Sequence, residues 1–364
     1  MKPTDETPCK LINARGTFTP LGVSRSSHTV AQAVADALID FADIGQLQAD
    51  ASKALATHTG AEAGAIVHCA AAGITMAVAA TMTGTSAQHI AQLPDTTGLV
   101  KGVALPMIHT VNYGQPIEQA VRLAGAVPIM VGDGIHCSLE DLDRVLSERA
   151  CCCLLLVSSR LTRGAPIDFK GAVDLAHRYG IPTIIDGAAQ DFRMRELLAT
   201  GADLLIVSAQ KYLAAPTAGL VVGHAALVEA VRAQEKGIGR GMKATKESIA
   251  GVLAALRERA SLDEVEWQRA QEAKVSAFIA RANSIPGIEG RQESDPTALP
   301  LVRAHLAISG PIGAQQLVER LRSGSPAIWV MDYRTADEEI VLELVHVHQA
   351  EIDIVLDRLR QCLA

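Results

Sequence analysis

Two residues at the ends of neighbouring apolar segments carry the most specific chemical signal in the chain. Lys211 comes three residues after Ser208, which closes the apolar run 204–208, and Asp186 closes the run 182–186. A lysine can bind pyridoxal phosphate as a Schiff base, and an aspartate can keep the pyridine nitrogen of that cofactor protonated. The pair predicts a pyridoxal-phosphate site if both side chains face one pocket.

Each of these residues also has a simpler interpretation. An aspartate at the end of a strand commonly caps the next helix, and a lysine after a strand is commonly a surface residue. Ser208 and Lys211 also match the Ser-x-x-Lys motif of serine β-lactamases. The Ser-Asp-Asn and Lys-Thr-Gly motifs expected with it do not occur in the sequence, which disfavours a serine hydrolase.

A turn of small residues supplies a second part of the predicted site. Cys69, Ala70 and Ala71 lead into an apolar helical segment at 74–82. Exposed N–H groups at a helix N-terminus bind phosphate, and small side chains let the phosphate come close. We therefore expect these three residues and Ser208 to bind the cofactor phosphate, although such a turn also occurs for packing alone.

Two further residues are candidates for contact with the cofactor ring. His109 follows the strand-like run 103–108, where it would be placed to stack on a flat ring, although a lone histidine is often structural. Ala188 comes two residues after Asp186 and is small enough to let the ring lie against the chain.

Metal binding is not expected. His346 and His348 would share one face of a strand, but no acidic or cysteine partner is evident for them. The seven cysteines include Cys151, Cys152 and Cys153 in one strand-like run and form no C-x-x-C pair. Buried, structural thiols are the favoured interpretation.

Charge and hydropathy limit the classes of partner. The formal net charge is −7 and no long basic run occurs, which argues against nucleic acid. No apolar run approaches the roughly 20 residues of a membrane span, and the segment 1–10 is polar, unlike a signal peptide. We expect a cytoplasmic protein that acts on a small molecule.

The elements that must position these residues alternate between two patterns. Nearly continuous apolar runs indicate buried parallel strands, and amphipathic segments between them indicate helices. This alternation predicts a three-layer α/β domain with a mostly parallel sheet, with its ligand at the carboxyl ends of the strands. The expected strands are 65–69, 103–108, 127–131, 152–157, 182–186, 204–208 and 220–223, and the expected helices are 74–82, 117–124, 139–148, 169–179 and 191–199.

The pattern changes after about residue 241. Two long helices are expected at 247–259 and 264–282, followed by a loop-rich stretch at 283–298. Strands at 299–308, 327–331 and 340–347 and helices at 313–322 and 349–363 then follow. We therefore expect an N-terminal arm at 1–27, a large cofactor-binding domain at 28–241 and a small α+β domain at 242–364.

Segments spread over most of the chain share a pattern with one enzyme family. They are 12–17 with 21–25, the turn 68–74 with His68 and Cys69 in place of Ser-Gly, His109 with Asn112 and Tyr113, Asp186, Ser208 with Lys211, and 321–328. In these segments the chain resembles fold-type I pyridoxal-phosphate enzymes of the selenocysteine synthase-like branch, which includes D-glucosaminate-6-phosphate ammonia-lyase.

The resemblance implies an aspartate aminotransferase-like fold, a homodimer and a lyase. The expected reaction is α,β-elimination and deamination of an amino acid or amino sugar acid. An aminotransferase or racemase on the same scaffold, or a binding protein without catalysis, remains an alternative. The branch usually has arginines near Val330 and Val345, where this chain has none. Arg25 or Arg334 is the expected substitute for binding a substrate carboxylate.

Overall fold

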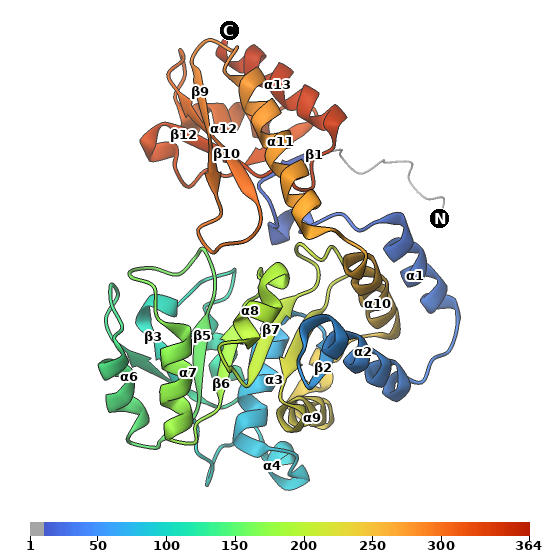
Figure 1. The fold of residues 1–364 in the computed structure, drawn as a ribbon, viewed down its shortest axis with the longest axis vertical. Coiled ribbons are helices and arrows are strands. Elements are labelled where there is room, and N and C mark those ends of the chain that lie inside the picture. Colours follow the sequence, from blue (N-terminus) through green and yellow to red (C-terminus); the bar gives the residue numbers. More distant parts are fainter. Residues whose placement is uncertain (1–10) are drawn as a thin grey trace. The chain divides into compact units, whose positions relative to one another are not determined.

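The computed structural model describes residues 11–364 and divides them into two compact units (Figure 1). The large unit is Ser26–Ser261, and the second unit combines Leu262–Ala364 with the described N-terminal residues up to Arg25. The polar segment 1–10 lies outside the described residues. Within residues 11–364, no helix is both long and apolar enough to cross a membrane.

A seven-stranded sheet forms the centre of the large unit. Its strand order is β2-β8-β7-β6-β5-β3-β4, and β8 runs antiparallel to both of its neighbours while the strands from β7 to β4 are parallel. The predicted mostly parallel α/β fold is therefore confirmed. The bounds are β2 (Ala63–Val67), β3 (Gly102–Pro106), β4 (Val127–Val131), β5 (Cys151–Val157), β6 (Thr183–Asp186), β7 (Leu204–Ser208) and β8 (Gly219–Gly223).

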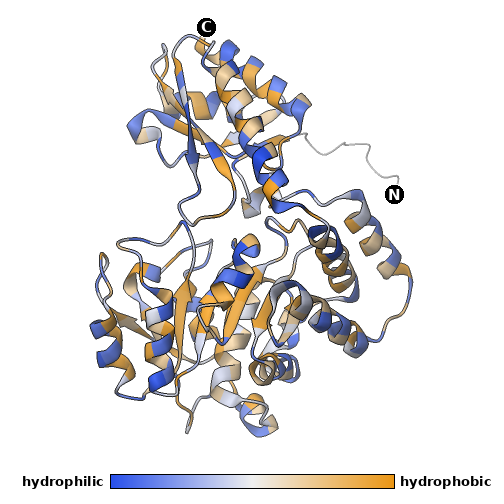
Figure 2. Cartoon of the chain, viewed as in Figure 1, coloured by the Kyte–Doolittle hydropathy of each residue, from blue (hydrophilic) through white to orange (hydrophobic). Residues whose placement is uncertain are grey.

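Helices cover both faces of this sheet, because its strands are apolar on both sides. Ile184 belongs to one core cluster together with residues of α3, α5 and α9, and Ile185 belongs to the other together with residues of α2, α6, α7 and α10. Figure 2 shows the strands of the large unit as mostly hydrophobic and the surrounding helices as mixed. The bounds are α1 (His28–Ile39), α2 (Ile44–Thr59), α3 (Ala70–Thr83), α4 (Ala87–Gln92), α5 (Ile117–Leu123), α6 (Leu139–Leu146), α7 (Phe169–Arg178), α8 (Met194–Leu198), α9 (Ala225–Ala233) and α10 (Lys246–Ala260).

The position of α10 differs from the expected domain boundary. The chain divides after Ser261 rather than after Gly241, so α10 belongs to the large unit. The physical reason is that Ile249 and Val252 of α10 are fully buried in the same core cluster as the sheet, and that α10 packs against α1 and α2. The two long helices look alike in the sequence, but only the second of them belongs to the second unit.

The second unit contains a three-stranded antiparallel sheet in the order β12-β10-β9 and a parallel pair of β1 with β11. Strand β9 forms where a loop was expected, because all seven residues of this mostly polar segment pair with β10, while only Ile288 among them is buried. The bounds are β1 (Leu11–Ala14), β9 (Ile288–Ser294), β10 (Val302–Ile308), β11 (Ala327–Val330), β12 (Glu339–Leu342), α11 (Glu264–Ala282), α12 (Ala314–Arg322) and α13 (Gln349–Leu363).

His346 and His348 do not share one face of a strand, as the sequence had suggested. Strand β12 ends at Leu342, so His346 lies in the following turn and His348 is the N-cap residue of α13. The side chain of His348 takes part in a capping box with Glu351, which gives this histidine a local structural contact.

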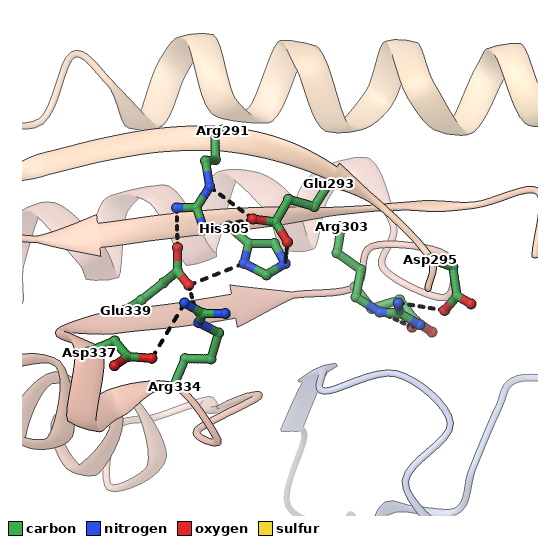
Figure 3. Close-up of polar contacts among 9 residues, drawn as sticks. Arg291, Glu293, Asp295, Arg303, His305, Arg334, Asp337 and Glu339 are labelled. Atoms are coloured by element: carbon green, nitrogen blue, oxygen red, sulfur yellow. Dashed lines mark hydrogen bonds and ion pairs between the residues drawn. The ribbon is translucent and has the colours of Figure 1, made fainter. Parts of the chain in front are cut away.

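A buried ion-pair group lies at one end of the second unit's sheet (Figure 3). Arg303 of β10 contacts Asp295 at 2.6 Å and Glu343 at 2.7 Å, and all three side chains are buried. The Glu343 carboxylate also lies against Gly16, where a Cβ atom would be only 2.6 Å from Glu343 Oε1. A side chain at position 16 would therefore displace this carboxylate from Arg303.

Candidate active site

Lys211 lies in the tight connection between the antiparallel strands β7 and β8, residues 209–218, which we call the lysine loop. The N–H group of Ala209 donates to the carbonyl of Ala218 at 2.9 Å, and that of Ala215 donates to the carbonyl of Ala209 at 3.0 Å. The N–H group of Lys211 itself donates to Ser208 O at 3.3 Å. These main-chain bonds fix the point from which the lysine side chain starts.

Asp186 ends β6 in the middle of the sheet and is buried. Its Oδ1 accepts a hydrogen bond from the N–H group of Ala188 at 3.0 Å. Burial raises the pKa of the Asp186 carboxyl to about 6, against the opposing effects of the Lys211 charge and the Ala188 amide. Burial likewise lowers the pKa of Lys211, and the Asp186 charge opposes that shift. The two predicted residues therefore lie within electrostatic reach of each other.

Ser208 and Ala188 join the two strand ends that carry Lys211 and Asp186. The N–H group of Ser208 donates to the carbonyl of Ala188 at 3.0 Å, and Ser208 is buried at the end of β7. This contact, with the Ala188–Asp186 bond, connects the two segments through main-chain atoms. The site is thus anchored to the sheet rather than to mobile loops, which favours precise positioning.

The turn at Cys69 leads into α3, as predicted, although the helix begins at Ala70 rather than at the expected residue 74. Cys69 is the N-cap residue, and its Sγ accepts from the N–H group of Ala72 at 3.5 Å. The first helical bond runs from Gly73 N to Cys69 O at 2.9 Å, so the N–H groups of Ala70 and Ala71 precede the helical ladder. Such N–H groups and the positive end of the helix dipole favour an anion.

Strand β8 passes against this turn at very short range. A Cβ atom on Gly219 would lie 2.5 Å from the carbonyl atoms of Cys69 and 2.8 Å from Ala70 N. Only glycine fits there without moving the turn. Since Gly219 pairs with Ser208 in the sheet, the turn and the start of the lysine loop are held in one arrangement.

His109 lies after β3, within the short 3-10 helix Met107–His109, and is buried. Its Nδ1 is 3.1 Å from the N–H group of Val157, and a main-chain N–H can only donate, so Nδ1 is the acceptor. Burial lowers the pKa of His109 to about 4, which keeps the ring neutral near pH 7. The ring meets Phe169 edge to face at 5.7 Å between centroids. Stacking of His109 on a cofactor ring stays a prediction.

Two residues near this site were not among the predicted site residues. Tyr113 Oη is buried and has no hydrogen-bond partner among residues 11–364. Burial raises the pKa of Tyr113, and the charges of Asp186 and Cys69 add to this effect. The only sequence signal for Tyr113 was its place in the His…Asn-Tyr pattern.

Arg160 is the second such residue. It is exposed, follows the carboxyl end of β5 by three residues, and its charge contributes to the lowered pKa of Lys211. Its position just after a predicted strand is a sequence signal for the site, because the carboxyl end of β5 lies next to that of β6, which carries Asp186.

The two arginines predicted for a substrate carboxylate both lie in the second unit and form ion pairs there. Arg25 makes a bidentate contact with Glu351, at 2.8 Å and 2.7 Å. Arg334 contacts Glu339 at 2.6 Å and Asp337 at 3.4 Å (Figure 3). A role in substrate binding would require each to release a carboxylate, so this role stays a prediction.

The groups gathered in the large unit fit pyridoxal phosphate. A buried carboxylate with a raised pKa suits a pyridine nitrogen that needs a proton partner. A lysine with a lowered pKa suits covalent attachment, and the N–H groups at the start of α3 suit the phosphate. The buried Tyr113 hydroxyl is one more polar group available to a bound molecule. Residues 11–364 hold no cluster of three or more His, Cys, Asp or Glu side chains able to bind a metal ion.

Comparison with known proteins decides the family. The D-glucosaminate-6-phosphate ammonia lyase of Salmonella typhimurium is 31% identical over 355 residues, which covers 97% of this chain and 95% of the relative. The model of the β-eliminating lyase family matches residues 159–291. The chain belongs to the β-eliminating lyase family. The predicted cofactor, pyridoxal phosphate, and the predicted class of enzyme, a lyase, are both confirmed for this member of the family.

Other relatives of this β-eliminating lyase show how widely the scaffold is used. A 5'-C-glycyluridine monooxygenase-decarboxylase from a Streptomyces species is 32% identical over 351 residues, covering 94% of this chain and 84% of the relative. A solved structure of D-glucosaminate-6-phosphate ammonia-lyase matches with a TM-score of 0.87 and 30% identity, covering 97% of this chain and 95% of that one. An L-seryl-tRNA(Sec) selenium transferase from Solidesulfovibrio magneticus is 25% identical over 276 residues, which covers 68% of this chain and 55% of the relative.

Proposed function

We propose that this lyase deaminates an amino sugar acid by α,β-elimination, with Lys211 and Asp186 as its catalytic residues. The β-hydroxyl group leaves as water, and hydrolysis of the resulting imine by one water then gives a 2-oxo acid and ammonia. The observation that carries the proposal is the placement of Asp186 at the end of β6 and of Lys211 just after the adjacent parallel strand β7. The charge of each residue also acts on the other. The likeness to a D-glucosaminate-6-phosphate ammonia lyase over 97% of the chain supports the substrate class.

The residues of the site have distinct roles in this proposal. The bound cofactor would supply an electron-withdrawing ring. Lys211 would attach the cofactor and, once released, take the α-proton of the substrate on Nζ, for which a lowered pKa is favourable. Asp186 would hold the proton on the pyridine nitrogen. The N–H groups of Ala70 and Ala71 and the Ser208 hydroxyl would bind the phosphate.

Arg160 is our proposed contact for the acidic group of the substrate. It follows β5 in the same unit as Lys211, and its charge acts on the lysine. Arg25 and Arg334 remain candidates for the same role, although each is paired with a carboxylate of the second unit.

A substrate screen tests the reaction. Purified enzyme loaded with cofactor would be incubated with amino sugar acids, with and without a phosphate ester, and with D- and L-amino acids. We expect ammonia and a 2-oxo acid in equal amounts from at least one amino sugar acid, and none from the Lys211→Ala variant. Accumulation of pyridoxamine phosphate would instead indicate an aminotransferase, and exchange of the α-hydrogen with inversion would indicate a racemase.

A second candidate is oxygen-dependent decarboxylation. The specific observation is the 32% identity over 94% of the chain with a monooxygenase-decarboxylase. Oxygen uptake measured with an electrode in the same screen separates the two reactions, because an elimination consumes no oxygen. A binding protein without catalysis would release no ammonia and take up no oxygen in this screen. If it also failed to bind the cofactor, it would lack the visible absorbance band of lysine-bound cofactor that borohydride bleaches.

We also propose that the enzyme is a homodimer located in the cytoplasm. Large apolar side chains are exposed at the end of α1 and in its connection to α2, where Leu38 is 56%, Ile39 is 83% and Phe41 is 107% exposed, and a second copy of the chain would cover them. All the cysteines within residues 11–364 are free thiols, which is usual in a reducing compartment. Light scattering of the wild type and of Phe41→Glu tests the dimer, since the variant should be monomeric.

A further inference from the structure

Helix α10 contacts the lysine loop at three places along one side of the helix. Ser248 Oγ donates to the carbonyl of Thr217 at 2.7 Å. At Gly251, a Cβ atom would lie 2.4 Å from Pro216 Cγ, so the helix and the loop touch. Arg259, near the end of the helix, donates from Nη2 to the carbonyl of Tyr212 at 2.8 Å. The loop is therefore attached to α10 on both sides of its turn, and one attachment is the carbonyl of the residue after Lys211.

Arg259 also binds the segment that follows Asp186. Its Nη2 lies 2.8 Å from Oδ2 of Asp191, and both side chains are buried. Its guanidinium carbon lies 3.8 Å from the centre of the Phe192 ring. Asp191 and Phe192 belong to the short 3-10 helix Asp191–Arg193, which begins five residues after Asp186. One side chain thus connects the segment after Asp186 to the main chain after Lys211.

The chemistry of these contacts explains why an arginine is present. A buried guanidinium is costly unless its charge is paired, and Asp191 supplies the counter-charge. The flat group can lie on an aromatic ring and still point its donors at two acceptors, whereas an ammonium group is a single point charge on a flexible stem. Loss of Arg259 would remove the hydrogen bond to Tyr212 and leave Asp191 without this buried partner.

We propose that Arg259 is a positioning residue for Lys211, which acts through the Tyr212 carbonyl and fixes the lysine loop relative to the segment that carries Asp186. The proposal rests on the proposed role of Lys211 as the cofactor lysine. Arg259 itself contacts neither the cofactor nor the substrate in this proposal. Its effect is on the geometry and the proton equilibrium of the lysine, because Asp191, its ion-pair partner, also acts on the Lys211 charge.

The test compares three variants of the full-length enzyme with the wild type. Arg259→Gln removes both the positive charge and the planar guanidinium group, and Arg259→Lys keeps only the charge. The control, Arg257→Gln, changes an exposed arginine two residues earlier on the same helix. Two readouts apply: hydrogen exchange of the peptide 209–218 in the cofactor-free protein, and the pH midpoint of the visible absorbance band in the cofactor-loaded protein.

We expect the backbone amide hydrogens of residues 209–218 to exchange about tenfold to a hundredfold faster in Arg259→Gln than in the wild type. This is the range expected when one hydrogen bond to a charged group is lost. The absorbance midpoint of Arg259→Gln should also move, while Arg257→Gln should match the wild type in both readouts. Arg259→Lys should fold, because it keeps a cation beside Asp191, and it should still show faster exchange in the loop.

The proposal is overturned if Arg259→Lys and Arg259→Gln keep the wild-type midpoint and loop exchange, even when their melting temperatures fall. Such a result would reduce Arg259 to a stabilising contact. If Arg259→Gln fails to fold, Arg259→Lys alone decides the question through the same two readouts. The proposed function has a separate control: if Lys211→Ala retains the borohydride-sensitive band, then the assignment of the cofactor lysine fails, whatever Arg259 does.

Discussion

The main-chain N–H group of Val157, at the end of β5, donates a hydrogen bond to Nδ1 of His109, which follows the adjacent parallel strand β3, at 3.1 Å. This bond can form only when Nδ1 carries no proton, so it fixes both the neutral state of the ring and the position of its proton on Nε2. The imidazole is therefore held in one orientation by the sheet itself.

The burial of this ring predicts how stability depends on pH. The pKa of His109 is lowered to about 4 in the folded protein, from 6.5, so the unfolded chain binds the additional proton between these values. Stability from this residue is complete above pH 6.5 and is lost as the pH falls towards 4, by about 3 kcal/mol. Urea unfolding of the cofactor-free protein at pH 7 and pH 5 measures this. His109→Asn, which keeps an acceptor but cannot titrate, should lose that part of the pH dependence, and an unchanged dependence would contradict the prediction.

Asp186 should behave in the opposite sense. Its pKa is raised to about 6 from 3.8, so the folded cofactor-free protein holds the proton more tightly than the unfolded chain between these values. Its cost to stability is absent below pH 3.8, grows as the pH rises to 6 and is then constant, at about 3 kcal/mol. We expect Asp186→Asn to be more stable than the wild type at pH 8 without cofactor, and to lose catalysis by several orders of magnitude with cofactor. Equal stability at pH 8 would show that the carboxylate is not strained by burial.

Gly219→Ala should disturb the turn at Cys69, the proposed phosphate site, without adding a group to that site. The added Cβ atom would lie 2.5 Å from the Cys69 carbonyl, so the turn or the strand must move. We expect stability to fall by about 1–3 kcal/mol, as for other overpacked sites, and the cofactor to bind at least about tenfold more weakly. Equilibrium dialysis with cofactor measures the binding. Gly134→Ala is the matched control, because nothing lies within 4 Å of the Cβ atom at that position.

Arg303→Met should destabilise the second unit strongly. It removes the cation from between the buried carboxylates of Asp295 and Glu343, and unpaired buried charges of this kind cost about 3–5 kcal/mol. Arg281→Met is the control, because its ion pair with Asp353 is half exposed and should contribute less than about 1 kcal/mol. Chemical denaturation followed by circular dichroism compares the two variants. A smaller loss for Arg303→Met than for Arg281→Met would contradict the prediction.

The sequence was informative about this protein where one local pattern decides the structure. The apolar runs at β4 and β7 and the amphipathic periods of α11 and α13 give the same bounds in the sequence as in the structure. Their bounds are set by their own residues, although β4 lies at the edge of the sheet and only its Val131 is buried. The polar strand β9 could not be recognised in this way, because it is an edge strand whose partner β10 supplies the hydrogen bonds.

Residues that contact the site from segments far away in the sequence could not be predicted from the sequence either. Asp186 and Lys211 stand at strand ends and could be paired by family resemblance. Arg259 could not, because its acceptor Tyr212 is 47 residues away and the helix that carries Arg259 was expected in the small domain. Pairings of this kind depend on how α10 packs, which no local pattern encodes.

The reversed direction of β8 has a consequence for the order of folding. Because β7 and β8 are antiparallel neighbours, the lysine loop closes over only the ten residues 209–218, and hairpins form in about 1–10 μs. The other neighbour of β8 is β2, which lies far earlier in the chain, so that Ala63 pairs with Gly223. Pairings between residues so distant in sequence form slowly. We expect the lysine loop to be among the first parts of this region to form, before β2 and the turn at the start of α3 pack beside it.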